Sequence, residues 1–468
     1  MKVKEQLAIQ YGVDHILLKK SYLDKLTELL QSDLDFHNQR SNYSSHNLHS
    51  FPAKFPPQLP KKFISELTMP LDVVLDPMAG SGTTVLEAFL ANRKAIGFDI
   101  DPLAIKLSTI KTTVFNRKKL VEYARIIYSG AQKEVEHKTE YLDDLLKSRF
   151  DLRTAQFIDY WFLPEVQREL IALLNQIAKI KDEKIRSFFE VIFSSIIITK
   201  TGGVSLALDL AHTRPHRAKI IFDKKNKLLF GEEYLDQNKR RDYVTKTLRS
   251  PLEEFEKKFH TSINGLLEYD PARIEPEIQF CDSQQLQLPD CSVDLIVTSP
   301  PYASNAIDYM RAHKFSLVWL GYKVDNLTLK RKDYIGGELV SNFLFEELPD
   351  FSKEKVGLIS GIDRKRGNVL KRYYSEMTRA LKEMYRVLKP GKAAIVVVGS
   401  SIMRGIDTET HKCLAEIGEN LGFIVPRIGV RKLDRNKRML PAGMKTDLNS
   451  QIQQRMHEEY VIGFYKPQ

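Results

Sequence analysis

The chain has 468 residues, which is too long for one minimal domain and sufficient for two or three. Hydrophobic residues make up 43% and charged residues 28%, so wholesale disorder is excluded, and the formal net charge of +11 suggests a polyanionic partner. Three cysteines exclude a disulfide framework, and no apolar run reaches the roughly 18 residues of a membrane span or resembles a secretory signal. We therefore expect a soluble, cytoplasmic protein.

The amino-terminal part of the sequence predicts a helical segment followed by a βαβ unit. Residues 1–45 carry leucines at helical spacing, and the proline-rich stretch FPAKFPPQLP after them cannot be a helix interior. From Leu71, LDVVLDP predicts a strand, MAGSG a flexible loop, TTVLEAFLANR a helix and KAIGFDIDP a second strand. We assign residues 46–138 to the first part of an α/β domain.

The rest of the chain predicts a long insertion and then the second part of the same domain. Residues 139–275 are charged and mostly helical in pattern, with a basic run from Lys224 to Arg249. Strand-and-turn patterns return at IQFCDS and SVDLIVTSPPY and continue through RVLKPGKAAIVVVGSS to the closing EEYVIGFYKP. Residues 276–468 thus complete one α/β sheet, interrupted by a polar insertion at 325–370.

The loop Asp76–Thr84 predicts a ligand site. It lacks the Gly-Lys-Ser/Thr ending of a P-loop, which argues against a nucleotide triphosphatase, but its two glycines let a ligand approach the backbone. Asp99 ends the next strand, where an acid can accept hydrogen bonds from ribose hydroxyls. These residues favour a nucleoside-containing ligand without a pyrophosphate; a structural βα turn with an incidental acid is the alternative.

The segment Thr298-Ser299-Pro300-Pro301-Tyr302 directly follows the strand VDLIV, at the edge of the sheet where open α/β folds bind ligands. Two prolines fix φ twice and remove two backbone donors, leaving carbonyl acceptors, one hydroxyl and one aromatic ring. That set suits an exocyclic amino group on a planar ring: oxygens accept its hydrogens while Tyr302 stacks on the base.

The glycine loop DPMAGSGTT together with TSPPY resembles the DNA amino-methyltransferases, which use S-adenosyl-L-methionine to methylate exocyclic amines of adenine or cytosine. The resemblance extends to AIGFDIDP, FCDSQQLQLPDCSVDLIVTSPPY, RVLKPGKAAIVVVGSS, HEEYVIGFYK and HSFPAKFPPQLP, about half of the chain. It implies a Rossmann-like, mainly parallel seven-stranded sheet with an antiparallel final hairpin and, here, helical insertions. It also implies double-stranded DNA as the partner, with the target base flipped out of the helix.

Carried across residue by residue, the resemblance places the catalytic turn at Ser299, Pro300, Pro301 and Tyr302. It places the cofactor's amino-acid end at the glycine loop, its ribose at Asp99 and its adenine at Asp282. The full set of expected cofactor-binding residues is Lys54, Phe55, Asp76, Pro77, Ala79, Gly80, Gly82, Thr83, Asp99, Ile100, Asp282 and Ser283. No metal is implied, since neither cysteines nor histidines have ligand spacing.

Several alternatives stay open on the sequence alone. Ser299 before the proline pair favours cytosine N4 as the target, since adenine-specific relatives more often carry Asp or Asn there. Adenine N6 is the alternative, as is an RNA or tRNA guanine methyltransferase, or a catalytically silent nucleic-acid-binding module. About 175 residues separate the segments at 76–104 and 280–283, which usually lie close together in the family. The order of the motifs therefore does not place the region that recognises the DNA sequence. Residues 139–275 are our candidate for it. A cognate restriction endonuclease is a candidate partner, and the oligomeric state is open.

Overall fold

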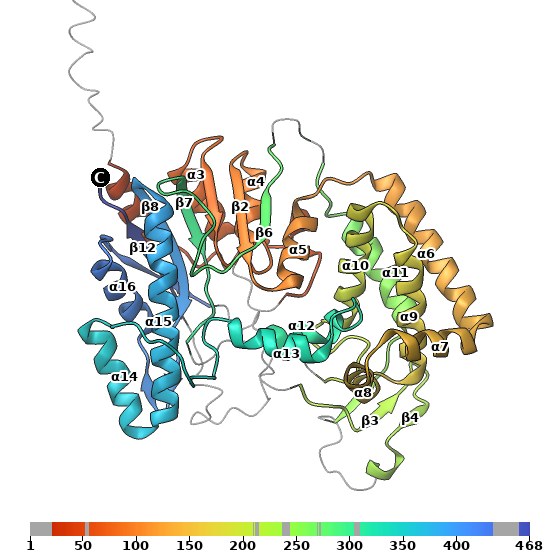
Figure 1. Cartoon of the computed structure of the whole chain (residues 1–468). Coiled ribbons are helices and arrows are strands. Elements are labelled where there is room, and N and C mark those ends of the chain that lie inside the picture. Colours follow the sequence, from red (N-terminus) through yellow and green to blue (C-terminus); the bar gives the residue numbers. More distant parts are fainter. Residues whose placement is uncertain are drawn as a thin grey trace, which may run out of the picture.

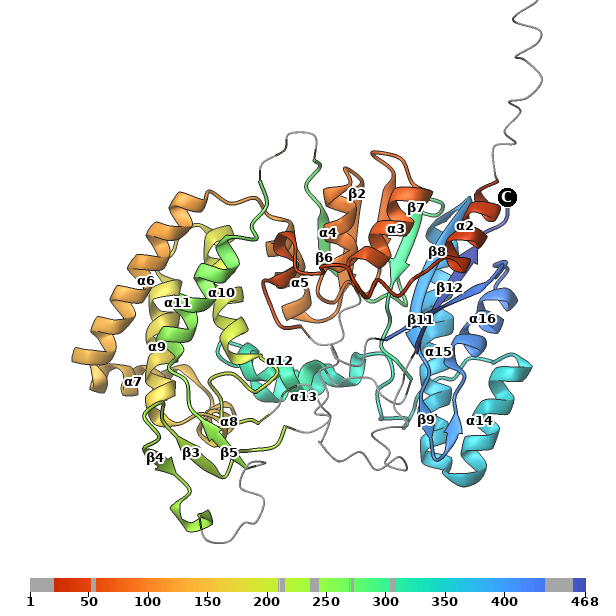
Figure 2. The same cartoon turned by 180° about the vertical axis from the view of Figure 1, so that it is seen from behind.

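The computed structural model describes residues 21–51, 56–208, 210, 215–235, 244–268, 270, 273–303, 309–433 and 458–468. Two parts stand side by side in Figure 1: a sheet with helices packed on it, and a group of helices contributed by the middle of the chain. Helices α12 (Tyr309–Leu317) and α13 (Val324–Lys330) lie below and between them, at one edge of the sheet (Figures 1 and 2). Within the described ranges, no helix is both long and apolar enough to cross a membrane.

The sheet has seven strands in the order β11-β12-β8-β7-β1-β2-β6, assembled from both ends of the chain. Strands β6, β2, β1, β7 and β8 pair in parallel, and β12 runs antiparallel to both of its neighbours. This confirms the mainly parallel sheet and its antiparallel final hairpin. The strands are β1 (Val73–Asp76), β2 (Lys94–Asp99), β6 (Glu277–Phe280), β7 (Val293–Thr298), β8 (Leu388–Gly399), β11 (Ile428–Lys432) and β12 (Glu458–Tyr465).

Both faces of the sheet are covered, which explains why its central strands are continuous apolar runs; all six residues of β7 are buried. Alternate residues of these strands pack on opposite faces. Leu75 and Ile296 join a core with α14, α15 and α16, whereas Val74 and Leu295 join a core with α2 and α3. The helices around the sheet are α2 (Tyr22–Gln31), α3 (Gln58–Leu67), α4 (Thr83–Leu90), α5 (Pro102–Thr112), α14 (Asp350–Ile362), α15 (Arg364–Val387) and α16 (Thr410–Asn420).

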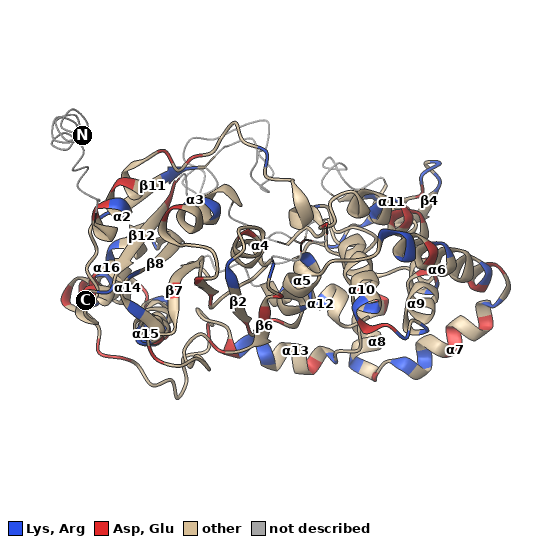
Figure 3. Ribbon diagram, turned by 90° about the horizontal axis from the view of Figure 1, so that it is seen from above, with Lys and Arg blue, Asp and Glu red and all other residues tan. Residues whose placement is uncertain are grey.

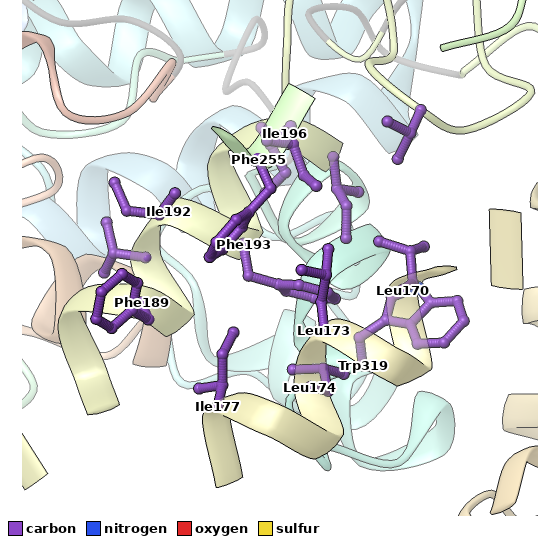
Figure 4. Packing of buried hydrophobic residues seen from close by; sticks show 14 of the residues in the cluster. Leu170, Leu173, Leu174, Ile177, Phe189, Ile192, Phe193, Ile196, Phe255 and Trp319 are labelled. Atoms are coloured by element: carbon purple, nitrogen blue, oxygen red, sulfur yellow. The ribbon is translucent and has the colours of Figure 1, made fainter. Parts of the chain in front are cut away.

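The middle of the chain folds as a helical unit, and its apolar core extends to Leu103, Leu107 and Ile110 of α5. Phe189, Phe193 and Leu173 pack there, and Trp319, from the segment after α12, enters the same cluster (Figure 4). Trp319 therefore ties the helical unit to the element that returns to the sheet. The helices are α6 (Arg117–His137), α7 (Thr139–Arg149), α8 (Leu152–Trp161), α9 (Pro164–Ala178), α10 (Glu183–Ile197) and α11 (Pro251–Ile263).

Two features of this unit differ from the expected organisation. Helix α6, which we assigned to the first part of the α/β domain, shares the core of α9 through Leu120, Ile127 and Ala131. We therefore propose that the insertion begins near residue 117 rather than 139. The unit also contains a three-stranded sheet in the order β4-β3-β5, formed by β3 (Ile220–Phe222), β4 (Leu228–Phe230) and β5 (Thr245–Thr247); three-residue strands are too short to give a recognisable alternation.

The remaining elements are short. The polar insertion at 325–370 holds α13, the 3₁₀ turn η4 (Arg331–Asp333) and α14. Strands β9 (Ile402–Met403) and β10 (Ile406–Asp407) pair as a small hairpin, and η1 (Ser44–Asn47) and η2 (Glu232–Tyr234) are single 3₁₀ turns. Pro390 and Gly391 lie inside β8, where its register against β7 shifts.

The glycine that begins α4 gives a stability prediction. Gly82 has φ +72°, and a Cβ there would lie 2.6 Å from Ser108 Oγ and 2.9 Å from Ser108 Cα on α5. Because both the backbone conformation and the contact with α5 oppose a side chain, Gly82→Ala should lower the free energy of unfolding by about 1–3 kcal/mol. Denaturant unfolding measures it. Gly357→Ala is the control: Gly357 lies within α14 with no atom near its added Cβ, so that change should be neutral or stabilising.

Candidate functional site

A pocket lies at the carboxyl ends of β1, β2 and β7, where the parallel strands deliver their following loops to one edge. It contains about 810 Å³ of empty space, part of it open to solvent. Its lining residues are Phe51, Pro77, Met78, Ala79, Gly80, Ser81, Thr83, Asp99, Ile100, Asp101, Cys281, Asp282, Ser283, Ser299, Pro301, Tyr309, Asp333, Tyr334 and Ile335.

The glycine loop forms one wall and is held from behind by α5. Gly80 has φ +50°, and its N–H donates to Asp99 Oδ2 at 2.7 Å. The fully buried Lys111 of α5 donates from Nζ to the Ser81 carbonyl at 2.5 Å, and Ser108 Oγ lies 3.3 Å from the Gly80 carbonyl. The loop is thus fixed by contacts on the side away from the pocket, which leaves the pocket side for a ligand.

Asp99 ends β2 and lines the pocket next to this loop. Its two oxygens accept backbone hydrogen bonds, from Gly80 N at 2.7 Å and Asp101 N at 2.9 Å. Burial and the neighbouring Asp101 raise the pKa of Asp99 to about 6. Because each carboxylate oxygen has two lone pairs, one on each oxygen remains for a ligand.

Asp76 ends β1 but is buried behind the pocket wall rather than lining it. Its Oδ1 accepts from Thr298 Oγ1 at 2.7 Å and from Met78 N at 3.2 Å, so it links the glycine loop to the end of β7. Burial raises its pKa to about 7. Gly82 also does not line the pocket; its lack of a side chain is needed for contact with α5.

The opposite wall comes from segments that the sequence analysis did not connect with the site. Asp101 caps α5, and its Oδ2 accepts from the Tyr334 hydroxyl at 2.9 Å and lies 2.5 Å from Nδ1 of the buried His313. Burial would raise the pKa of Asp101, but these contacts outweigh it and hold the pKa below its usual value. Phe51 stacks on Tyr309 with ring centroids 5.8 Å apart. Asp101 thus joins the β2–α5 turn, α12 and the polar insertion around one pocket.

The proline turn contributes two residues to the same pocket. Ser299 and Pro301 line it, whereas Pro300 is buried and Tyr302 points its hydroxyl to Glu459 Oε1 at 2.9 Å. Thr298 bonds to Asp76, and Ser401 Oγ donates to the Ala303 carbonyl. The turn is therefore anchored at both ends, by strands β1 and β12 and by the segment that follows β8.

The structure brings most of the expected site residues together. Those that line the pocket are Pro77, Ala79, Gly80, Thr83, Asp99, Ile100, Asp282, Ser283, Ser299 and Pro301. Asp76, Gly82, Pro300 and Tyr302 support it from behind, and Lys54 and Phe55 fall outside the described residues. Among the missed residues, Asp101 carried a usable signal, since an acid directly before Pro102 marks a helix N-cap; Tyr309 and Tyr334 carried none. No cluster of three possible metal ligands occurs in the described ranges.

Comparison with known proteins gives a consistent result. Residues 14–110 match a family described as DNA methylase. The Type II methyltransferase M.MvaI of Kocuria varians is 26% identical over 422 residues, covering 84% of this chain and 86% of the relative. M.AvaI of Nostoc sp. is 25% identical, covering 76% and 74%. A Thermus thermophilus protein, TTHA0409, described as a putative DNA modification methylase and solved with S-adenosyl-L-methionine, covers 39% of this chain and aligns over 51% of its own length at 18% identity, with a TM-score of 0.20, too low to support any conclusion.

The sheet is mainly parallel with seven strands, and the glycine loop, Asp99 at the end of β2 and the proline turn meet at its carboxyl edge. This arrangement defines a Rossmann-like methyltransferase fold. The family match over residues 14–110 and the similarity to Type II methyltransferases support the DNA amino-methyltransferase family for this chain, with S-adenosyl-L-methionine as the cofactor.

Proposed function

We propose that the protein transfers a methyl group from S-adenosyl-L-methionine to the exocyclic amino group of a flipped base in double-stranded DNA, namely cytosine N4. The observation that carries the proposal is that Ser299 of the proline turn and Asp99 at the end of β2 line one pocket. A nucleoside-binding acid and a set of amine acceptors thus face the same space. Such an enzyme acts in the cytoplasm, where the DNA of a prokaryotic cell lies.

The residues of the pocket fit the cofactor. Asp99 has lone pairs to accept from ribose hydroxyls, and Gly80 leaves the loop free of a side chain where the amino-acid end would lie. Asp282 and Ser283, after β6, would contact the adenine, and Phe51 and Tyr309 supply aromatic faces. The bound cofactor supplies an electrophilic methyl group on a sulfonium.

The chain's own residues act on the amine. Its lone pair is delocalised into the base ring, which makes it a weak nucleophile. Hydrogen bonds from its N–H groups to Ser299 Oγ and to carbonyls of the proline turn favour tetrahedral geometry and return the lone pair to nitrogen. The rigid proline pair holds these acceptors in place and excludes competing backbone donors.

The choice of base rests on Ser299. The family resemblance favours cytosine N4 for serine before the proline pair, with adenine N6 as the alternative. Mass spectrometry of nucleosides from methylated DNA decides: N4-methylcytosine is expected, and N6-methyladenine alone would defeat the assignment.

DNA binding is assigned to the faces beside the pocket. The helical unit adjoins the pocket through α12, whose Tyr309 lines it, and it is our candidate for sequence recognition. Both positive and negative residues occur along α6 and α7 (Figure 3).

The basic run of the insertion gives a salt-dependence prediction. Lys239, Arg240 and Arg241 lie outside the described residues, and their charge alone motivates the test. If all three contact phosphate, changing them to Ala should reduce the slope of log affinity against log salt by about 2–3. Fluorescence anisotropy between low and high salt measures the slope; an unchanged slope and affinity would make the run a solvated surface.

Cofactor binding should depend on pH through Asp99. An ionised carboxylate accepts ribose hydroxyls better than a protonated one, so binding should lower the Asp99 pKa from about 6 and release a proton. We expect affinity to rise severalfold from about pH 5.5 to about pH 7.5 and then level off. Calorimetry in two buffers of different ionisation enthalpy measures the released proton. Asp99→Asn should remove the rise of cofactor affinity with pH. Asp76→Asn is the control, because the pKa of Asp76 is also raised, to about 7.

The experiment that tests the function is single-molecule sequencing of host DNA with and without the gene. A base modified at one sequence motif only when the gene is present supports the proposal and supplies the motif. Labelled methyl transfer to tRNA but not DNA would replace it with the RNA alternative. The Type II relatives favour a role in restriction–modification, with a cognate endonuclease that cuts the same motif.

A further inference from the structure

Residues 332–339 of the polar insertion form part of the pocket wall, and the reaction scheme above gives them no role. Asp333, Tyr334 and Ile335 of this segment line the pocket. The Tyr334 hydroxyl donates to Asp101 Oδ2 at 2.9 Å, and Ile335 is buried in the core that α14, α15 and α16 form with the sheet. The segment therefore contacts the pocket on one side and the core on the other.

A buried ion pair on α15 holds this segment. Arg372 Nε donates to Glu376 Oε1 at 2.8 Å, and the two side chains are 7% and 3% exposed. Arg372 also donates to two carbonyls of the segment, from Nη2 to Lys332 at 2.8 Å and from Nη1 to Leu339. Glu376 Oε2 accepts from Gly336 N at 2.7 Å. The pair thus binds the backbone at the start, the middle and the end of the segment.

The glycine pair of the segment lets the chain pass close to the guanidinium. Gly336 has φ +81°, and a Cβ on Gly337 would lie 3.0 Å from Arg372 Cζ and from both of its Nη atoms. A buried ion pair often stabilises a fold no more than apolar residues of the same size would. What this pair does supply is a fixed position for the segment.

We propose that Arg372 and Glu376 are positioning residues for the cofactor, which hold residues 332–339 as a preformed wall of the pocket. This rests on the proposed function, because it takes S-adenosyl-L-methionine as the ligand of the pocket. A wall that is ordered before binding adds no ordering cost to association, whereas an unanchored wall lowers the apparent affinity by the fraction of time that it is in place. Once the cofactor is bound the wall is in place in either case, so the chemical step should not slow.

Arg372→Lys tests the proposal with the charge kept. A lysine ammonium can still pair with Glu376, but it lacks the planar fork that reaches the Lys332 and Leu339 carbonyls at once. Calorimetry of the full-length protein without DNA should show cofactor binding weakened about tenfold or more. The KM for the cofactor should rise by the same factor, while kcat at saturating cofactor stays within about twofold of wild type.

Glu376→Gln is the second variant. A carboxylate accepts from Arg372 and Gly336 at once, whereas an amide has a single oxygen and must lose one of these partners. It should therefore weaken cofactor binding by about threefold or more, again with little change of kcat.

Arg379 is the matched control. It lies further along α15 and holds the next part of the same insertion: its Nε donates to Glu346 Oε1 at 2.7 Å, and its Nη2 donates to the Leu344 carbonyl. Neither Glu346 nor Leu344 lines the pocket. Arg379→Lys should therefore bind the cofactor as the wild-type protein does.

Hydrogen exchange measures the position of the segment directly. In the free wild-type protein the Gly336 amide, which is bonded to Glu376, should be protected. In free Arg372→Lys the peptide that covers residues 332–339 should exchange faster, and saturating cofactor should restore the protection.

The outcomes separate the two proposals. If Arg372→Lys and Glu376→Gln bind the cofactor as tightly as wild type, if kcat falls as much as affinity, or if Arg379→Lys weakens binding equally, the positioning role is overturned while the proposed function stands. If the wild-type protein binds no S-adenosyl-L-methionine, the proposed function fails first. Thermal unfolding identifies a variant that does not fold; the two variants change opposite members of the pair, so either one alone decides.

Discussion

Ser299→Ala is expected to lower the rate of methyl transfer by about 10²–10⁴-fold while changing cofactor affinity less than about twofold. Groups that accept protons or hydrogen bonds in the transition state contribute effects of this size. Ser299 lines the pocket after β7, whereas the glycine loop and Asp99, which we assign to the cofactor, are anchored by other contacts. Single-turnover transfer of a labelled methyl group measures the rate, and calorimetry measures the affinity.

Ser292 is the control for the loss of a serine hydroxyl next to β7. Ser292 precedes β7 at its opposite end, where its Oγ donates to the Pro289 carbonyl at 2.7 Å, far from the pocket residues. Ser292→Ala should leave both rate and affinity unchanged. A Ser299→Ala protein that keeps more than a tenth of the wild-type rate would move the catalytic role to the carbonyls of the turn.

Patterns local in sequence predicted the sheet edge well. Asp99 is the last residue of β2 and Ser299 directly follows β7, and parallel strands deliver such residues to one edge regardless of their separation in the chain. That geometric rule brought β1 and β7 together across more than 200 residues, as their pairing at Val74 and Leu295 confirms.

Contacts that depend on tertiary packing were not predictable in the same way. His313 and Tyr334 meet Asp101 only because α12 and the polar insertion fold back over the end of β2. Neither has a motif, and an aromatic residue at helical spacing is usually a core residue. Glu459 reaches Tyr302 because β12 is antiparallel, a fact that strand patterning alone does not provide. Asp76 and Gly82 belong to the glycine-loop motif that the sequence identified, but neither lines the pocket. Both support the pocket wall from behind.

Asp99→Ala is expected to weaken S-adenosyl-L-methionine binding by about 1–3 kcal/mol, or roughly 5- to 150-fold, the cost of losing hydrogen bonds to a charged group. The change would remove two acceptors for ribose hydroxyls. It would also leave the N–H groups of Gly80 and Asp101 without their carboxylate partner. Loss of affinity alone therefore does not distinguish direct contact with the ribose from a disturbed glycine loop.

Comparison of two ligands separates the two causes. S-adenosylhomocysteine and its 2′-deoxyribose analogue differ by one hydroxyl, so the wild-type protein should prefer the ribose form severalfold if Asp99 accepts from it. Asp99→Ala should bind both ligands weakly and equally. If the variant weakens both by the same factor and keeps the wild-type preference, Asp99 acts on the cofactor only through Gly80 and the loop, and the ribose must find its acceptor elsewhere in the pocket. Asp101 would be the next carboxylate to test, but its oxygens already serve the α5 cap, His313 and Tyr334, which leaves Asp99 with the more accessible lone pairs.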